Sequence, residues 1–256
     1  MRKNLIRYLI SILLIIFLAG CAPVAEPEPT ATAAPTAAAP SPSPSPQSPV
    51  EASLFCDLPL PGPDDWTVIM CERFDDNRNE WEVESQDNPY ARYTSAITGG
   101  KFVVDYTAKG FAGYTKSALT WFTIGEGTNF ALSINGLIDT PHLSGASWGI
   151  AFRGDEDSFF LFSILNDGTY RFEITENGGR DWDTLITTRV YSGIRLGEEN
   201  TLQIEAAGRD FYFSINDTLI NQFSGALLDG EEILLVVSAK EGVSAVFSFD
   251  DVVLQR

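Results

Sequence analysis

Two segments of the sequence combine aromatic rings with charged side chains close to predicted turns. One is G-G-R-D-W-D-T, residues 178–184, and the other is N-P-Y-A-R-Y, residues 88–93. A flat ring can contact the apolar face of a sugar while neighbouring polar groups bind its hydroxyls. The candidate ligand-binding residues are Trp182, Arg180, Asp183, Tyr90, Arg92 and Tyr93. Packing of Trp182 against a neighbouring strand is the open alternative.

Acidic residues at the two ends of the predicted folded region suggest a metal site. Asp75 and Asp76 lie near its start, and Asp250 lies near its end. Calcium prefers carboxylate and carbonyl oxygens, so a structural Ca²⁺ would draw on a side chain from each end where the terminal strands run side by side. Solvated acidic turns are the alternative, and no other cofactor is predicted.

No catalytic residues are predicted. His142 is the only histidine, and its T-P-H-L-S context favours a solvated turn over a general base. The glycines lack the strand-to-helix context that phosphate-binding loops require. The sequence therefore favours a binding module over an enzyme.

The first twenty residues have the pattern of an export signal. M-R-K-N-L-I-R is positively charged, and an apolar run of about thirteen residues follows, which is short for a bilayer-spanning helix of ~20. The run ends in L-A-G and Cys21, which resembles the lipobox of bacterial lipoproteins, where the thiol receives a diacylglycerol. This resemblance implies lipid anchoring outside the cytoplasm, on the cell membrane or the outer membrane. An uncleaved anchor with an unmodified cysteine is the alternative.

The two remaining cysteines are Cys56 and Cys71. An even pair in an exported chain predicts a disulfide, because oxidation is the default outside the cytoplasm. Closing a loop of about fifteen residues would stabilise the fold by ~3 kcal/mol in the chain-entropy model. Two buried free thiols are the alternative.

Composition divides the chain into three parts. Residues 1–20 are the predicted signal peptide, and residues 21–50 are rich in Ala, Pro, Ser and Thr without large apolar side chains. That composition predicts an extended, disordered tether. Residues 51–256 alternate β-branched or aromatic residues with polar ones, punctuated by Gly, Asn and Asp. They predict one all-β domain.

About a dozen short strands are expected in residues 51–256. Examples are K-F-V-V-D-Y-T-A from residue 101, W-G-I-A-F-R from residue 148 and E-I-L-L-V-V-S-A from residue 232. Strands joined by tight turns form antiparallel sheets, and this number predicts two packed sheets. We therefore expect an antiparallel β-sandwich.

Three stretches resemble the concanavalin A-like lectin/glucanase jelly rolls, in particular laminin-G-like and 3-keto-disaccharide hydrolase-type domains. The first is F-D-D-N-R-N-E-W from residue 74. The second runs from residue 149 to residue 172 and contains G-I-A-F-R, F-F-L-F-S-I and D-G-T-Y-R-F. The third is E-N-T-L-Q-I-E-A-A-G-R-D-F-Y-F-S-I-N from residue 199. The resemblance implies the fold strongly and the function poorly. Glycanases of this fold carry Glu-x-Asp-x-x-Glu on one strand, whereas here the nearest match is Glu173 and Glu176, whose spacing predicts opposite faces.

Charge narrows the range of partners. Without the three basic residues of the leader, 14 basic side chains remain against 35 acidic ones, a formal net charge of −21. Such a charge repels nucleic acid and anionic lipid head groups. We expect a monomeric, membrane-anchored module that binds a glycan or another extracellular ligand. A structural or protein-interaction domain of the cell envelope is the second hypothesis, and a glycoside hydrolase without the usual motif is the third.

Overall fold

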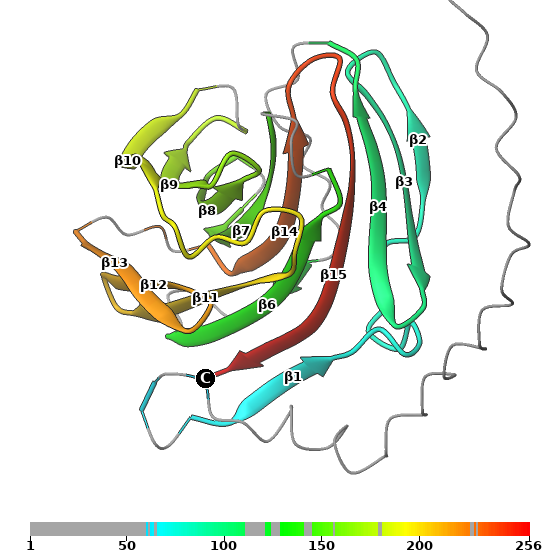
Figure 1. Ribbon diagram of the computed structural model, residues 1–256. Coiled ribbons are helices and arrows are strands. Elements are labelled where there is room, and N and C mark those ends of the chain that lie inside the picture. The colour runs from blue at the N-terminus through cyan, green and yellow to red at the C-terminus, as the bar shows by residue number, and fades with distance from the viewer. Residues whose placement is uncertain are drawn as a thin grey trace, which may run out of the picture. The chain divides into compact units, whose positions relative to one another are not determined.

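The computed structural model describes residues 60, 62–63, 66–110, 121–123, 129–140, 145–155, 157–178, 181–225, 228 and 230–256. Within these ranges all regular structure is β-strand, arranged in two antiparallel sheets that pack face to face (Figure 1). The predicted all-β jelly-roll sandwich is therefore confirmed. None of these ranges contains a helix long and apolar enough to span a bilayer. Cys21, Cys56, Arg180 and His142 lie outside the described residues, so the predictions for the lipid anchor and the disulfide stay predictions.

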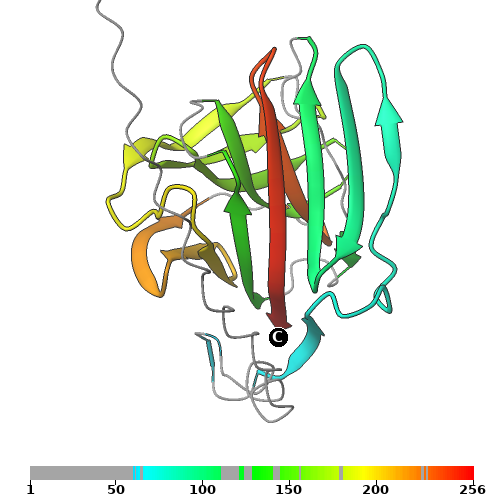
Figure 2. The ribbon, with the colours of Figure 1, turned by 45° about the vertical axis from the view of Figure 1, so that its right-hand side comes forward.

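The larger sheet has nine strands in the order β13-β12-β11-β6-β15-β4-β3-β2, and β1 pairs with the far end of β15. Figure 2 shows its central strand, β15 in red, between the green strands β6 and β4. The strands of this sheet are β1 (Val68–Glu72), β2 (Ser85–Asp87), β3 (Ala91–Thr98), β4 (Lys101–Ala108), β6 (Phe130–Ile138), β11 (Asn200–Ala207), β12 (Asp210–Ile215), β13 (Thr218–Ser224) and β15 (Ser244–Gln255).

The smaller sheet has six strands in the order β10-β9-β8-β7-β14-β5. Its strands are β5 (Trp121–Thr123), β7 (Ala146–Gly154), β8 (Phe159–Leu165), β9 (Thr169–Thr175), β10 (Asp183–Val190) and β14 (Glu232–Ala239). Strands β7, β8, β9 and β10 follow one another in the chain and in the sheet, and short connections join β7 to β8 and β8 to β9.

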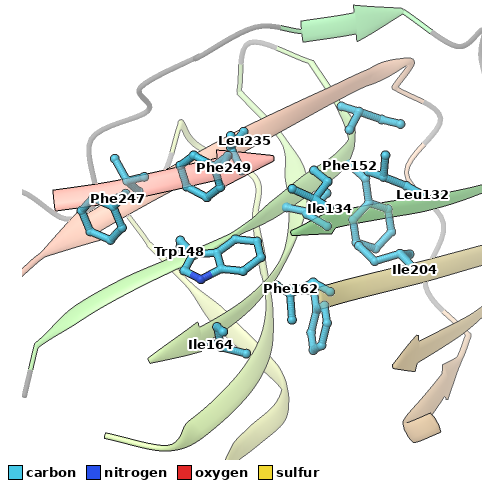
Figure 3. Close-up of a cluster of buried hydrophobic side chains, with 14 of the residues drawn as sticks. Leu132, Ile134, Trp148, Phe152, Phe162, Ile164, Ile204, Leu235, Phe247 and Phe249 are labelled. Atoms are coloured by element: carbon cyan, nitrogen blue, oxygen red, sulfur yellow. The ribbon is translucent and has the colours of Figure 1, made fainter. Parts of the chain in front are cut away.

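The core lies between the sheets, where alternate residues of each strand meet (Figure 3). In β7 the inward residues are Trp148, Ile150 and Phe152, each no more than 1 % exposed. Trp148 meets Phe249 of β15 edge-on, with 5.3 Å between ring centroids. Because successive residues of a strand point to opposite faces, the residues between these core positions face the outer side of the smaller sheet.

Two of the tryptophans that the structure describes are buried in the core. Trp81 and Trp148 are 2 % and 1 % exposed, whereas the side chain of Trp121 lies outside the described residues. Gly136 of β6 leaves room for the indole of Trp148, because a Cβ there would lie 2.6 Å from its Cζ2. Any larger residue at position 136 would displace a ring from the core.

The segment that opens the domain packs its two aromatic ends against the larger sheet. The rings of Phe74 and Trp81 lie 4.8 Å apart between centroids, and both contact Phe102 of β4. The segment F-D-D-N-R-N-E-W therefore contributes to the core through its first and last residues. The pairing of β1 with β15, with Val68 opposite Gln255, confirms that the terminal strands run side by side.

Candidate functional site

A groove of about 580 Å³ lies on the outer face of the smaller sheet. Its size falls within the ~300–1,000 Å³ of typical small-molecule sites. Strands β7, β8, β9 and β14 form its floor, and residues that follow β9 and β14 form its margins. The larger sheet contributes none of the described lining residues, so the groove belongs to this single sheet.

The register of the strands creates the hollow. One row across the floor pairs Val236 with Gly149, Gly149 with Ser163, and Ser163 with Arg171. The two central residues of this row are small, so the surface is low there. A Cβ at Gly149 would lie 2.3 Å from the Phe162 carbonyl oxygen, so this position accepts only glycine without a shift of the backbone.

An ion pair occupies the floor of the groove on β9. The guanidinium Nε of Arg171 lies 2.9 Å from Oε2 of Glu173, and the same Nε donates a hydrogen bond of 3.4 Å to the hydroxyl of Ser163. Because the two charged residues are two apart on one strand, they share the outer face. Glu173 is 8 % exposed, and burial raises the pKa of its carboxyl while the neighbouring Arg171 opposes that rise.

Hydroxyl groups lie beside the ion pair. Ser147 of β7 and Ser238 of β14 are paired across the strands, with 3.2 Å between their hydroxyl oxygens. Ser163 supplies a third hydroxyl in the adjacent row. These groups donate and accept hydrogen bonds without carrying charge.

Trp182 lines the margin of the groove near β9. Its ring is partly exposed and meets Phe159 of β8 edge-on, with 5.7 Å between centroids. Trp182 also packs against an apolar cluster on this outer face that includes Leu161 and Val236. Trp182 therefore packs on the sheet and also lines the groove, and its contact with a ligand stays a prediction.

The opposite margin is formed by Lys240 and Glu241, which follow β14. The backbone N–H of Lys240 donates a hydrogen bond to the carbonyl of Gly145. A Cβ added at Gly145 would lie 2.8 Å from Cδ of the Lys240 side chain. Gly145 has a φ of +119°, so a side chain at this position is disfavoured on two grounds. This margin thus presents one positive and one negative side chain.

No family model matches the chain, and no curated protein matches it. Solved structures resemble it at low sequence identity. A GlcNAcα1-4Gal-releasing endo-β-galactosidase from Clostridium perfringens has a TM-score of 0.53 at 10 % identity, covering 76 % of this chain and 64 % of that one. The catalytic domain of an endo-1,3-β-glucanase (laminarinase) from Thermotoga petrophila RKU-1 has a TM-score of 0.48 at 11 % identity, covering 75 % and 98 %. The carbohydrate binding module CBM66 from Bacillus subtilis has a TM-score of 0.39 at 14 % identity, covering 71 % and 91 %.

The fold is a jelly roll. The likeness to the endo-β-galactosidase supports the concanavalin A-like architecture, and at 10 % identity it shows the fold alone. The chemistry of this chain therefore has to be argued from its own side chains.

Of the predicted ligand-binding residues, the structure places Trp182 in the groove. Asp183 is exposed at the start of β10 and is absent from the described lining. Tyr90 and Arg92 are exposed at the edge of the larger sheet, where β2 pairs with β3. They are thus on a different sheet from Trp182 and do not form one site with it.

Tyr93 corrects the prediction for the N-P-Y-A-R-Y segment. The residue is 4 % exposed, its hydroxyl donates a hydrogen bond to the carboxylate of Glu84, and its ring stacks on Tyr106 at 6.4 Å between centroids. In the alternation of β3 this position points to the buried side. Its ring face is therefore not available as a surface platform.

The groove contains polar residues that the sequence analysis did not assign to a site. Arg171 and the three serines were overlooked, and Glu173 was considered only as part of a catalytic motif. The available signal was a polar residue at an outward position of an otherwise apolar strand, as in F-S-I and V-S-A. Only the register between strands shows that these positions are neighbours.

The residues of the predicted calcium site do not form a recognisable carboxylate cluster where the structure describes them. Asp75 and Asp76 are exposed, and Asp76 is paired with Arg78, with 2.8 Å from Arg78 Nε to Asp76 Oδ1. Among the residues that the structure describes, no group of three His, Cys, Asp or Glu side chains could hold a metal ion. β1 and β15 are adjacent, as the prediction required, and a calcium ion between the two ends of the domain stays a prediction.

The surroundings of Asp250 are expected to make the stability of the fold depend on pH. Burial and the neighbouring Asp251 raise the pKa of Asp250 from 3.8 to about 6. The folded protein therefore retains a proton between about pH 4 and pH 6 that the unfolded chain has lost, so stability falls as the pH rises through this window. We expect Asp250→Asn to raise the free energy of unfolding at pH 7 by about 1–2 kcal/mol. Urea unfolding at pH 5 and pH 7 measures the change.

The matched control is Asp105→Asn, which removes the same charge from an exposed position of β4. This substitution should leave the difference between the free energies of unfolding at pH 5 and pH 7 as it is in the wild-type protein. Equal effects of the two substitutions would mean that overall charge, and not the surroundings of Asp250, sets the pH dependence.

Proposed function

We propose that the groove on the outer face of the smaller sheet binds a glycan. The observation that carries this proposal is that one hollow brings together the ring of Trp182, the Arg171–Glu173 ion pair and the serine hydroxyls. An aromatic ring contacts the apolar face of a sugar, whereas paired donors and acceptors bind its hydroxyls. The groove supplies both kinds of group within one site.

We further propose that binding occurs without cleavage. A glycosidase needs an acid and a second carboxylate on opposite sides of the scissile bond. The described lining holds two carboxylates, Glu173 on the floor and Glu241 at the margin, and Glu173 is engaged by Arg171. The raised pKa of Glu173 is the one observation that favours a hydrolase as the second candidate.

Screening of the full-length protein against neutral oligosaccharides tests both statements. The panel contains glucans, galactans, mannans and fructans, and each mixture is assayed for binding and for new reducing ends after long incubation. We expect binding of at least one member with no release of reducing ends. New reducing ends would show that the domain is a hydrolase and not only a binding module. Absence of binding to every oligosaccharide would contradict the proposal that the groove binds a glycan.

The same proposal includes display of the domain outside the cytoplasm through a lipid on Cys21. It is supported by the charged start, the apolar run and the L-A-G-C motif of the leader. Detergent-phase partitioning compares the wild-type chain with Cys21→Ala in a bacterial host. Retention of the variant in the detergent phase would contradict a covalent anchor at this position.

A further inference from the structure

We infer that the groove selects neutral glycans and rejects uronate, sulfated and phosphorylated ones. This inference rests on the proposed function of the same site and concerns the class of ligand. It follows from how the charges of the groove are arranged, because the two cations among its described lining residues are matched by two carboxylates.

The ion pair on the floor is the first argument. Arg171 is the only cation on the floor among the described lining residues, and it is engaged by Glu173 at 2.9 Å. Glu173 is 8 % exposed, so drawing Arg171 away to a ligand carboxylate would leave a second carboxylate buried without its partner. Leaving the buried member of an ion pair without its partner in this way is unfavourable.

A neutral sugar avoids this cost. Its hydroxyls can accept from the remaining N–H groups of Arg171 and donate to the oxygens of Glu173 while the ion pair stays intact. Ser147, Ser163 and Ser238 add uncharged donors and acceptors beside the pair. The chemistry of the floor thus matches hydroxyl groups better than anions.

The balance of charge over the whole groove is the second argument. Its described lining contains four charged side chains, Arg171, Lys240, Glu173 and Glu241, whose formal charges sum to zero. The full chain has 17 basic and 35 acidic side chains, a formal net charge of −18. The surrounding field therefore repels a polyanion, and the described lining residues supply no excess of positive charge that compensates for it.

Matched glycan pairs test the inference with the full-length protein. Each neutral oligosaccharide of the panel is compared with the same backbone oxidised at C6 to the uronate, at low and at high salt. We expect the neutral member to bind at least about tenfold more tightly at low salt, because like charges oppose association. We expect its affinity to change little with salt.

The two levels of the argument fail in different ways. Tighter binding of an oxidised member would overturn the neutral selectivity while leaving a glycan-binding groove in place. Absence of binding to every member, neutral or acidic, would overturn the proposed function and this inference together.

Glu173→Gln provides a second test with a gain of binding as its readout. The substitution keeps the shape of the side chain but releases the charge of Arg171, so the preference for the neutral member should fall by at least about tenfold. The control is Glu176→Gln, which removes the same charge from an exposed residue that is not part of the described lining. An unchanged preference in folded Glu173→Gln protein, or an equal change in both variants, would contradict the role assigned to the ion pair.

Discussion

Trp182→Ala is expected to lower the affinity of the full-length protein for its glycan by about 30-fold or more. Tryptophan side chains are among the residues whose truncation in a binding site commonly costs about 2 kcal/mol or more, and every 1.4 kcal/mol is tenfold in affinity. Trp182 lines the groove and is only partly buried, with Phe159 as its aromatic neighbour. Its loss should therefore remove ligand contact with a smaller effect on folding. Isothermal titration with the best-binding oligosaccharide measures the change.

Tyr90→Ala is the matched control for this experiment. Tyr90 is 62 % exposed and belongs to the other segment in which the sequence predicted an aromatic platform. It lies beside the larger sheet, away from the groove residues, so its removal should leave the affinity within about twofold, as for surface substitutions generally. A loss of binding in Tyr90→Ala with none in Trp182→Ala would move the ligand to the edge formed by β2 and β3.

The contrast between these two aromatic segments shows how far sequence predicts the site. Both segments combine aromatic and charged side chains near turns, so the local sequence alone does not show which of them lies at a binding site. Tyr93 is buried because the alternation of β3 places it on the inner side, whereas Trp182 follows β9 and reaches the outer face. Trp182 shares the groove with Arg171 and Ser163. These two residues lie on different strands and become neighbours only through strand pairing. Register between strands is a tertiary property and leaves little trace in a single sequence.

The fold was more predictable than the site, for a related reason. Strands with one buried and one exposed face alternate clearly, as in β11, and were recognised. Seven of the eight residues of strand β10 are exposed or half-buried, so this strand shows no apolar alternation in the sequence. Strands β2 and β5 have three residues each, too few to show a period. Burial creates the pattern that sequence reading detects, and edge strands lack it.

Glu72→Ala is expected to lower the free energy of unfolding by about 3 kcal/mol or more, because each buried donor left without an acceptor costs about 1–3 kcal/mol. Glu72 is 3 % exposed at the end of β1. Its Oε1 accepts a hydrogen bond of 2.6 Å from the backbone N–H of Phe74, and its Oε2 accepts hydrogen bonds of 2.6 Å from Asn79 Nδ2 and 3.1 Å from Trp81 Nε1. One carboxylate thus ties the opening segment to the sheet at several points.

The backbone of the segment makes this carboxylate more important. Phe74 has a φ of +54°, in the left-handed region that costs a non-glycine residue about 1–2 kcal/mol. The hydrogen bond from its N–H to Glu72, together with burial of its ring against Trp81 and Phe102, compensates for that strain. Without Glu72, both the backbone turn and the position of the Trp81 indole lose their main polar support.

Urea denaturation followed by tryptophan fluorescence measures the effect on stability, with two companion variants. Glu72→Gln should lie between wild type and Glu72→Ala, because its amide oxygen still accepts but its NH₂ group faces donors. Glu176→Ala, at an exposed position, should change the free energy of unfolding by less than about 0.5 kcal/mol. A loss of under about 1 kcal/mol in Glu72→Ala would mean that water replaces the carboxylate, because solvent-satisfied donors cost little. The opening segment would then be held by its aromatic contacts alone.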